Sequence, residues 1–193
     1  MFTMKKRTPA TRIAVRLLMS VLAITWLAAC TTAPRTVDDR SDLRRDADSA
    51  LSEARSNNAS FDALIRRSPG YAVFPSVGKG GALVGGAYGR GIVYANGAQV
   101  GYTDLSQATV GAQLGGQTYT QILVFESASA LDRFRQGNYE FSAQATAVAL
   151  HSGEGANARF EEGVAVFTMA EQGLMAEAAI GGQKFSYQAF ALR

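Results

Sequence analysis

The chain has 193 residues, 47% of them hydrophobic and 18% charged, which is enough for one folded domain with a buried core. Its formal net charge is +3, but five of the 19 basic residues and none of the 16 acidic ones precede residue 30. The rest of the chain is therefore slightly acidic, which argues against a nucleic-acid partner. One cysteine and one histidine leave no intramolecular disulfide and no conventional zinc site.

The N-terminal segment resembles the signal of a bacterial lipoprotein. A basic front is followed by an apolar stretch from Leu17 to Trp26 and then by Leu27-Ala28-Ala29-Cys30. A basic front, a short apolar core and small residues at the exit are typical of a secretory signal. The ending is similar to a lipobox, which implies cleavage before Cys30 and a diacylglycerol and an acyl chain on that residue. We expect a signal peptide over 1–29; the alternatives are an ordinary signal with a chance cysteine and a signal anchor.

Residues 30–36 are expected to form a polar tether, followed by a single domain over 37–193 that begins with a helical segment. From Val37 to about Arg55, acidic residues come early and a thin apolar stripe recurs at spacings of three and four, which predicts a helix. Ser60 is the expected N-cap of a second, shorter helix that Pro69-Gly70 closes.

From Tyr71 onward, glycine is frequent and apolar residues alternate at period two, which predicts strands. Asn96-Gly97 predicts a hairpin turn. Between Ala108 and Phe125, apolar residues alternate with polar ones, which predicts a strand pair or one long bent strand with a buried face and a wet face. The residues expected on the buried face include Val110, Leu114, Ile122 and Val124, and those on the wet face are Thr109, Gln113, Gln117 and Gln121.

A short helix is predicted over Ser127 to Arg135, and the last strands over Val164–Met169 and Leu174–Tyr187. The pattern Ala-x-aliphatic-Gly-Gly occurs three times, ending at Gly86, Gly116 and Gly182. Because paired glycines let strands bend, these segments predict equivalent bends in one sheet. The expected fold class is α+β, mostly β: a curved antiparallel sheet or barrel-like sandwich with N-terminal helices and one inserted helix.

No catalytic constellation is present in the sequence. Gly78-Lys79-Gly80-Gly81 lacks the spacing of a phosphate loop, and Gly89-Arg90-Gly91 lacks the third glycine of a dinucleotide site. His151 and Ser152 are neighbours in a polar segment, which is not a nucleophile–base arrangement. We expect no enzyme, no cofactor and no metal; the alternative within this class is a hydrolase that uses Ser152 or an unrecognised acid pair.

The basic residues of the globular part allow two interpretations. They are either scattered solubilising charges or cations that converge beside glycine-rich loops to hold a lipid phosphate. An acyl anchor would supply proximity, so weak contacts would suffice for a headgroup preference. These basic residues are Arg66, Arg67, Lys79, Arg90, Arg133, Arg135 and Lys184.

Three ordered blocks resemble the SYLF domain family. Residues 71–81 (YAVFPSVGKGG) are similar to its opening motif, residues 84–91 (VGGAYGRG) to its second block, and residues 110–117 (VGAQLGGQ) to its third. The resemblance implies lipid binding without known enzymatic activity; eukaryotic members are associated with phosphoinositides and, in yeast, with actin. Lys79 and Arg90 match basic positions of these motifs, so the resemblance implies that they are the first candidates for headgroup contact. Arg66 and Arg67, just before the first block, are weaker candidates. The helix expected from Val37 differs from the basic, apolar helix of eukaryotic members, because it carries five early aspartates.

The expected function is that of a lipid-anchored bacterial envelope protein whose domain binds phospholipids with anionic or phosphoinositide-like headgroups. Lipoproteins that stay at the inner membrane commonly have an aspartate directly after the lipidated cysteine, and this chain has Thr31 there. We therefore expect the protein at the outer membrane, facing the periplasm. The alternative is a structural or protein-interaction lipoprotein of that membrane, with a protein partner that the sequence does not name.

Overall fold

The computed structural model describes residues 33–34, 36–82, 84–137, 139–141, 148–149, 159–180 and 182–191. The expected signal peptide (1–29), Cys30 and part of the tether lie outside the described residues, as do His151 and Ser152. Residues Thr32–Arg193 form one compact unit, and it is this unit that is described below.

Three helices belong to this unit: α2 (Val37–Asn57), α3 (Ala59–Arg67) and α4 (Ala128–Arg135). The expected N-cap of α3 at Ser60 is wrong. The Oδ1 atom of Asn58 accepts a hydrogen bond from the backbone N–H of Phe61 at 2.9 Å, and Asn58 has the extended backbone that an N-cap requires. Ser127 caps α4 as its position predicts. No helix in the described part of the chain is long and apolar enough to cross a membrane.

The strands form one curled sheet, and the longest of them is a single strand of 28 residues rather than a strand pair. The two last strands also differ from the expected ones, since the first runs on without a break to Ile180. The strands are β1 (Gly70–Gly81), β2 (Val84–Ala95), β3 (Ala98–Phe125), β4 (Tyr139–Phe141), β5 (Val148–Ala149), β6 (Val164–Ile180) and β7 (Gln183–Ala189).

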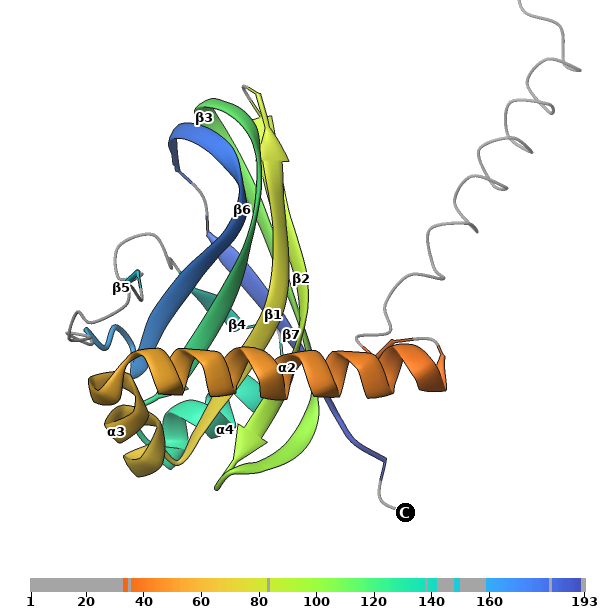
Figure 1. Ribbon diagram of the computed structural model, residues 1–193, viewed down its shortest axis with the longest axis vertical. Coiled ribbons are helices and arrows are strands. Elements are labelled where there is room, and N and C mark those ends of the chain that lie inside the picture. Colours follow the sequence, from red (N-terminus) through yellow and green to blue (C-terminus); the bar gives the residue numbers. More distant parts are fainter. Residues whose placement is uncertain are drawn as a thin grey trace, which may run out of the picture. The chain divides into compact units, whose positions relative to one another are not determined.

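Strand β3 organises the sheet because its two halves have different neighbours. Residues 98–110 pair with β2, and residues 101–107 of that half also pair with β7. Residues 110–125 pair with β6, and most of that half also pairs with β1. Since β1 also pairs with β2, the sheet curls into an antiparallel half-barrel; β5 adds one short parallel pairing on β6 (Figure 1). The predicted α+β, mostly β class with a curved antiparallel sheet is confirmed.

Glycines pair with one another at the end of the sheet that is uppermost in Figure 1, where β1 turns into β2 and β3 bends. Gly81 is opposite both Gly85 and Gly115. A Cβ atom on Gly81 would lie 2.4 Å from the Cα of Gly85, and Gly115 has a φ of +116°. Only glycine fits both positions without strain, so the paired glycines permit the tight curl. We call this end of the sheet the tip.

Two apolar cores fix the other end of the sheet. On its outer face, α2 and α3 cover Tyr71, Ile92 and Val124, and α2 contributes the predicted stripe of Ala47, Ala50, Leu51 and Ala54. On its inner face, inside the curl, α4 packs against a cluster rich in aromatic residues. That inner cluster includes Phe74, Leu105, Leu123, Phe125, Phe134 and Phe185. The helices thus stabilise one half of the sheet and leave the tip uncovered (Figure 1).

Candidate functional site

The structure does not bring the four predicted cations together. Arg66 and Arg67 end α3, just before β1 begins, whereas Lys79 lies near the other end of β1. Lys79 is opposite Ala87, which belongs to the inner core, so Lys79 is on the inner face. Arg90 is three residues further along β2 and therefore on the outer face. Lys79 and Arg90 lie on opposite faces of the sheet.

A bulge in β1 causes this separation. Tyr71 and Val73 belong to the outer core, yet Val77 belongs to the inner core. Between Val73 and Ser76 the pairing with β2 shifts, so the alternation of faces along β1 changes at that point. Without the bulge, Lys79 would share the outer face with Arg90.

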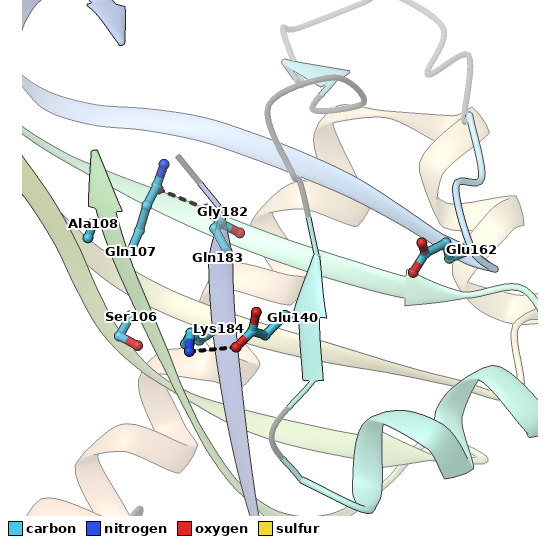
Figure 2. A pocket seen from close by; sticks show the side chains of 8 residues that line it. All are labelled: Ser106, Gln107, Ala108, Glu140, Glu162, Gly182, Gln183 and Lys184. Carbon is cyan, nitrogen blue, oxygen red and sulfur yellow. Dashed lines mark hydrogen bonds and ion pairs between the residues drawn. The ribbon is translucent and has the colours of Figure 1, made fainter. Parts of the chain in front are cut away.

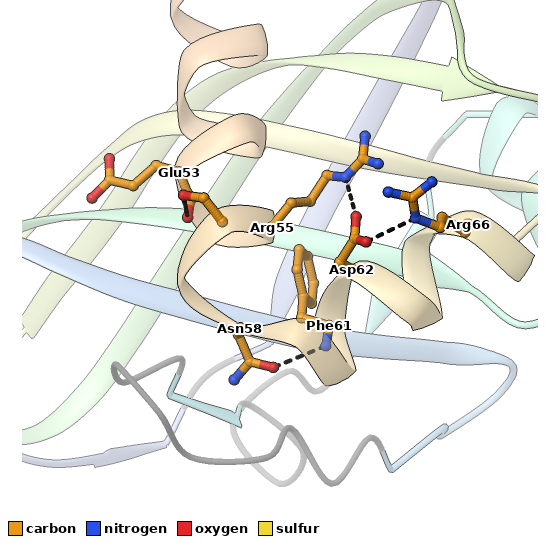
Figure 3. A network of polar contacts seen from close by, with 7 residues as sticks. Glu53, Arg55, Asn58, Phe61, Asp62 and Arg66 are labelled. Atoms are coloured by element: carbon orange, nitrogen blue, oxygen red, sulfur yellow. Dashed lines mark hydrogen bonds and ion pairs between the residues drawn. The ribbon is translucent and has the colours of Figure 1, made fainter.

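Arg66 is part of a polar network at the junction of α2 and α3 (Figure 3). Its Nε donates to one carboxylate oxygen of Asp62 at 2.8 Å, and Arg55 Nε donates to the other oxygen at 2.6 Å. These hydrogen bonds lower the pKa of the Asp62 carboxyl, and the one from Arg66 has the larger effect. Arg67 is exposed on the same helix. The Arg66–Asp62 pair lies within α3, and the Arg55–Asp62 pair joins α2 to α3.

Arg90 lies in a small cluster on the outer face with Tyr88 and Asp104. The Arg90 Nε donates to the Tyr88 hydroxyl at 3.1 Å, and that hydroxyl donates to Asp104 Oδ1 at 3.4 Å. Arg90 Nε is 3.8 Å from the same carboxylate oxygen. The Arg90 side chain remains 39% exposed against 20% for Asp104, so the guanidinium is accessible from solvent.

The Asp104 carboxyl has a perturbed pKa. Burial raises it from 3.8 to about 6, against the opposing effects of the Arg90 charge and of the Tyr88 hydrogen bond. In mildly acidic solution Asp104 therefore takes up a proton and loses its negative charge. The positive charge of Arg90 is then no longer balanced by a neighbouring carboxylate. The cluster is more cationic at low pH.

Three large apolar side chains are exposed on the same outer face as this cluster, between it and the end of the sheet. Val84 and Val110 are directly opposite each other on β2 and β3, and each is 69% exposed. Tyr88 is on the same face of β2 and is 51% exposed. The only other large apolar side chain this exposed in the described residues is Val37, on α2. We call Val84, Tyr88, Arg90 and Val110 the tip patch.

The sequence pattern did not reveal the tip patch. Val110 was expected on the buried face that Ile122 and Val124 share, but it is exposed because no helix covers the tip. Thr109 and Gln121 were expected on the wet face, but both are buried inside the curl. At the tip, polar side chains point inward and apolar ones outward, which is the reverse of an ordinary water-facing sheet. The available signal was that Val84 and Val110 each stand directly before a glycine in the sequence.

The chemistry available at the tip patch is contact with a surface. Among the described residues, no group of three or more His, Cys, Asp or Glu side chains could hold a metal ion. A cation and exposed aliphatic side chains on the same sheet face instead suit an amphipathic partner. The fold is mostly β, and the tip patch gives it an exposed face that is both apolar and cationic.

The comparisons identify the family of this domain. Residues 106–189 match the Ysc84 family, described as "Las17-binding protein actin regulator". A curated protein, beta cell expansion factor A of Aeromonas veronii, is 29% identical over 140 residues, covering 72% of this chain and 53% of that protein. The chain thus spans about half the length of this relative. Both matches confirm the predicted resemblance to the SYLF domain family, and the match to the Ysc84 (SYLF) family covers residues 106–189 of this chain.

Proposed function

We propose that this domain binds the surface of phospholipid membranes through its tip patch and catalyses no reaction. The observation that carries the proposal is the exposure of Val84 and Val110 at the end of the sheet that the helices leave uncovered, with Arg90 on the same face six residues further along β2. The valines enter the boundary between headgroups and acyl chains, and the Arg90 guanidinium contacts a lipid phosphate.

The strength of this contact is modest. Removing most of one exposed valine side chain from water contributes about 1 kcal/mol, and a guanidinium near an anionic surface contributes about 1 kcal/mol more. The two valines and Arg90 together give about 3 kcal/mol, which is weak binding for a free domain. An acyl anchor on Cys30 would hold the domain at the bilayer and make such a contact effective. The proposal therefore includes lipidation of Cys30, cleavage of residues 1–29 and location at the outer membrane of a bacterial envelope, facing the periplasm.

The resemblance to the SYLF family supports a binding role. The proposal adds a preference for anionic lipid headgroups. We assign headgroup contact first to Arg90, because its side chain is exposed on the same face as the valines. Lys79 lies on the inner face, and Arg66 and Arg67 lie at the opposite end of β1. Substitution of these three residues therefore separates a tip contact from general attraction between charges.

Liposome sedimentation of residues 32–193 tests the proposal, with the Cys30 anchor absent so that the domain alone is measured. Binding is expected to rise with the fraction of anionic lipid and to fall with salt. Arg90→Ala should weaken it, and Lys79→Ala should leave it unchanged. Binding that ignores both lipid charge and Arg90→Ala would contradict the proposal and favour the alternative, a structural or protein-interaction lipoprotein.

A further inference from the structure

The Asp104 carboxylate is the partner of the cation in the tip patch. Asp104 on β3 is directly opposite Arg90 on β2, and its side chain is less exposed than that of Arg90, 20% against 39%. The Oδ1 atom of Asp104 accepts a hydrogen bond from the Tyr88 hydroxyl at 3.4 Å and lies 3.8 Å from Arg90 Nε. One partly buried oxygen therefore contacts both polar side chains of the tip patch.

The neighbouring charges on this face, towards β7 and β4, form a second pair. Asp104 is opposite Ser186 on β7, and the next row of the same face holds Lys184 on β7 and Glu140 on β4. Lys184 Nζ forms an ion pair with Glu140 at 2.5 Å (Figure 2), and both line a hollow of about 200 Å³ with Asp104. The two pairs of opposite charges sum to zero while Asp104 is ionised and to +1 once Asp104 is protonated.

Helix α2 lies on the same face, on the side of Asp104 away from the tip. The Arg44 guanidinium is 5.8 Å from the ring centre of Tyr102, which comes two residues before Asp104 on β3. Asp48 of α2 accepts a hydrogen bond from the Tyr94 hydroxyl at 2.7 Å. These two charges of α2 thus contact aromatic side chains of the outer core, whereas the groups that act on the pKa of Asp104 belong to β2.

The position of Asp104 between α2 and the tip brings its protonation into the mildly acidic range. Burial raises the pKa of the carboxyl to about 6, although the Arg90 charge and the Tyr88 hydrogen bond both act to lower it. An anionic membrane adds to this effect, because a surface potential of about −30 mV concentrates protons about threefold at the surface. Protonation removes the carboxylate that competes with a lipid phosphate for the Arg90 guanidinium.

We propose that Asp104 is a proton-operated switch of the tip patch, which strengthens the contact with anionic membranes in mildly acidic conditions. This inference rests on the proposed function, because it concerns the regulation of the same surface. Removing one negative charge beside an anionic surface should tighten binding about fivefold. Because linkage is reciprocal, binding to the membrane should favour the protonated form of Asp104 by the same factor.

The test is vesicle sedimentation of residues 32–193, which contain every described helix and strand and both apolar cores and therefore fold as one unit. Phosphatidylcholine vesicles with and without phosphatidylglycerol are compared at about pH 5 and about pH 7.5, at one ionic strength. All proteins compared carry His151→Gln, because an ordinary histidine titrates in the same range and would add its own positive charge at the lower pH.

The parent protein should bind anionic vesicles about fivefold more tightly at the lower pH and neutral vesicles equally at both. Asp104→Asn should bind at both pH values as the parent does at the lower one. Glu140→Gln is the matched control, because it removes an exposed carboxylate from the same face, and it should keep the fivefold ratio.

Two results would overturn the switch. One is equal binding of the parent protein to anionic vesicles at both pH values, which requires no variant at position 104 to fold. The other is a pH ratio that Asp104→Asn leaves unchanged. No binding at either pH would instead overturn the proposed function, and the switch with it.

Discussion

Replacing the two exposed valines of the tip patch with threonine should weaken membrane binding without weakening the fold. Threonine keeps the β-branched shape that a strand favours and exchanges one methyl group for a hydroxyl. Val84 and Val110 are each 69% exposed and touch no helix, so the free energy of unfolding should change by less than about 0.5 kcal/mol per site.

The magnitude follows from the surface that each valine would bury in the bilayer. Losing one methyl from an apolar environment costs about 0.8 kcal/mol, and placing a hydroxyl there adds a few tenths more. For Val84→Thr combined with Val110→Thr the total is about 2 kcal/mol, or roughly a 30-fold weaker partition into vesicles. Sedimentation with anionic vesicles measures this ratio directly.

Val37 supplies the matched control, because it is 78% exposed on α2, outside the tip. Val37→Thr makes the same chemical change on an exposed side chain and should leave vesicle binding unchanged. Equal weakening by Val37→Thr and by the double variant would refute the argument, since it would mean that exposed apolar surface in general, and not the tip, drives the binding.

Three further predictions concern single side chains. Arg90→Gln should lower affinity for anionic vesicles about fivefold, the equivalent of about 1 kcal/mol, whereas Arg66→Gln should not; a matching loss in both variants would contradict a specific role for Arg90. Because burial raises the Asp104 pKa from 3.8 to about 6, wild type loses stability as the pH rises through this interval. The stability of Asp104→Asn relative to wild type, followed by urea unfolding, should therefore increase between about pH 4 and pH 7 by about 2 kcal/mol after solvent screening; a flat difference would rule out the raised pKa. Asn58→Ala should cost about 1 kcal/mol in thermal unfolding and Ser60→Ala much less, and the reverse order would show that the cap of α3 lies at Ser60.

The elements predicted most reliably were those with local physical signals. The turn at Asn96-Gly97 follows from the positive φ of both residues, +50° and +79°, which this dipeptide adopts easily. The stripe from Ala47 to Ala54 follows from helical spacing, and the cap at Ser127 from its position before an apolar run. The paired glycines predicted a curled sheet because no other residue allows strands to approach so closely.

The tip patch could not be predicted because alternation along a strand defines two faces but not how far each face is covered. Val124 and Val110 share one strand, yet the first is fully buried under helices and the second is 69% exposed. The sequence also did not show that Lys79 and Arg90 lie on opposite faces of the sheet, because the face of Lys79 depends on one bulge between Val73 and Ser76. Register and coverage are properties of tertiary structure, which a single sequence does not show.

The most direct test of tip-patch binding places a fluorescent reporter in the patch. The chain has one tryptophan, Trp26, so residues 32–193 contain none, and Tyr88→Trp introduces a single reporter. With vesicles that contain lipids brominated on their acyl chains, the indole of the Tyr88→Trp variant should shift its emission to shorter wavelength and be quenched. The indole of a Val37→Trp variant should do neither. Unquenched emission at position 88, or stronger quenching at position 37, would contradict membrane binding through the tip.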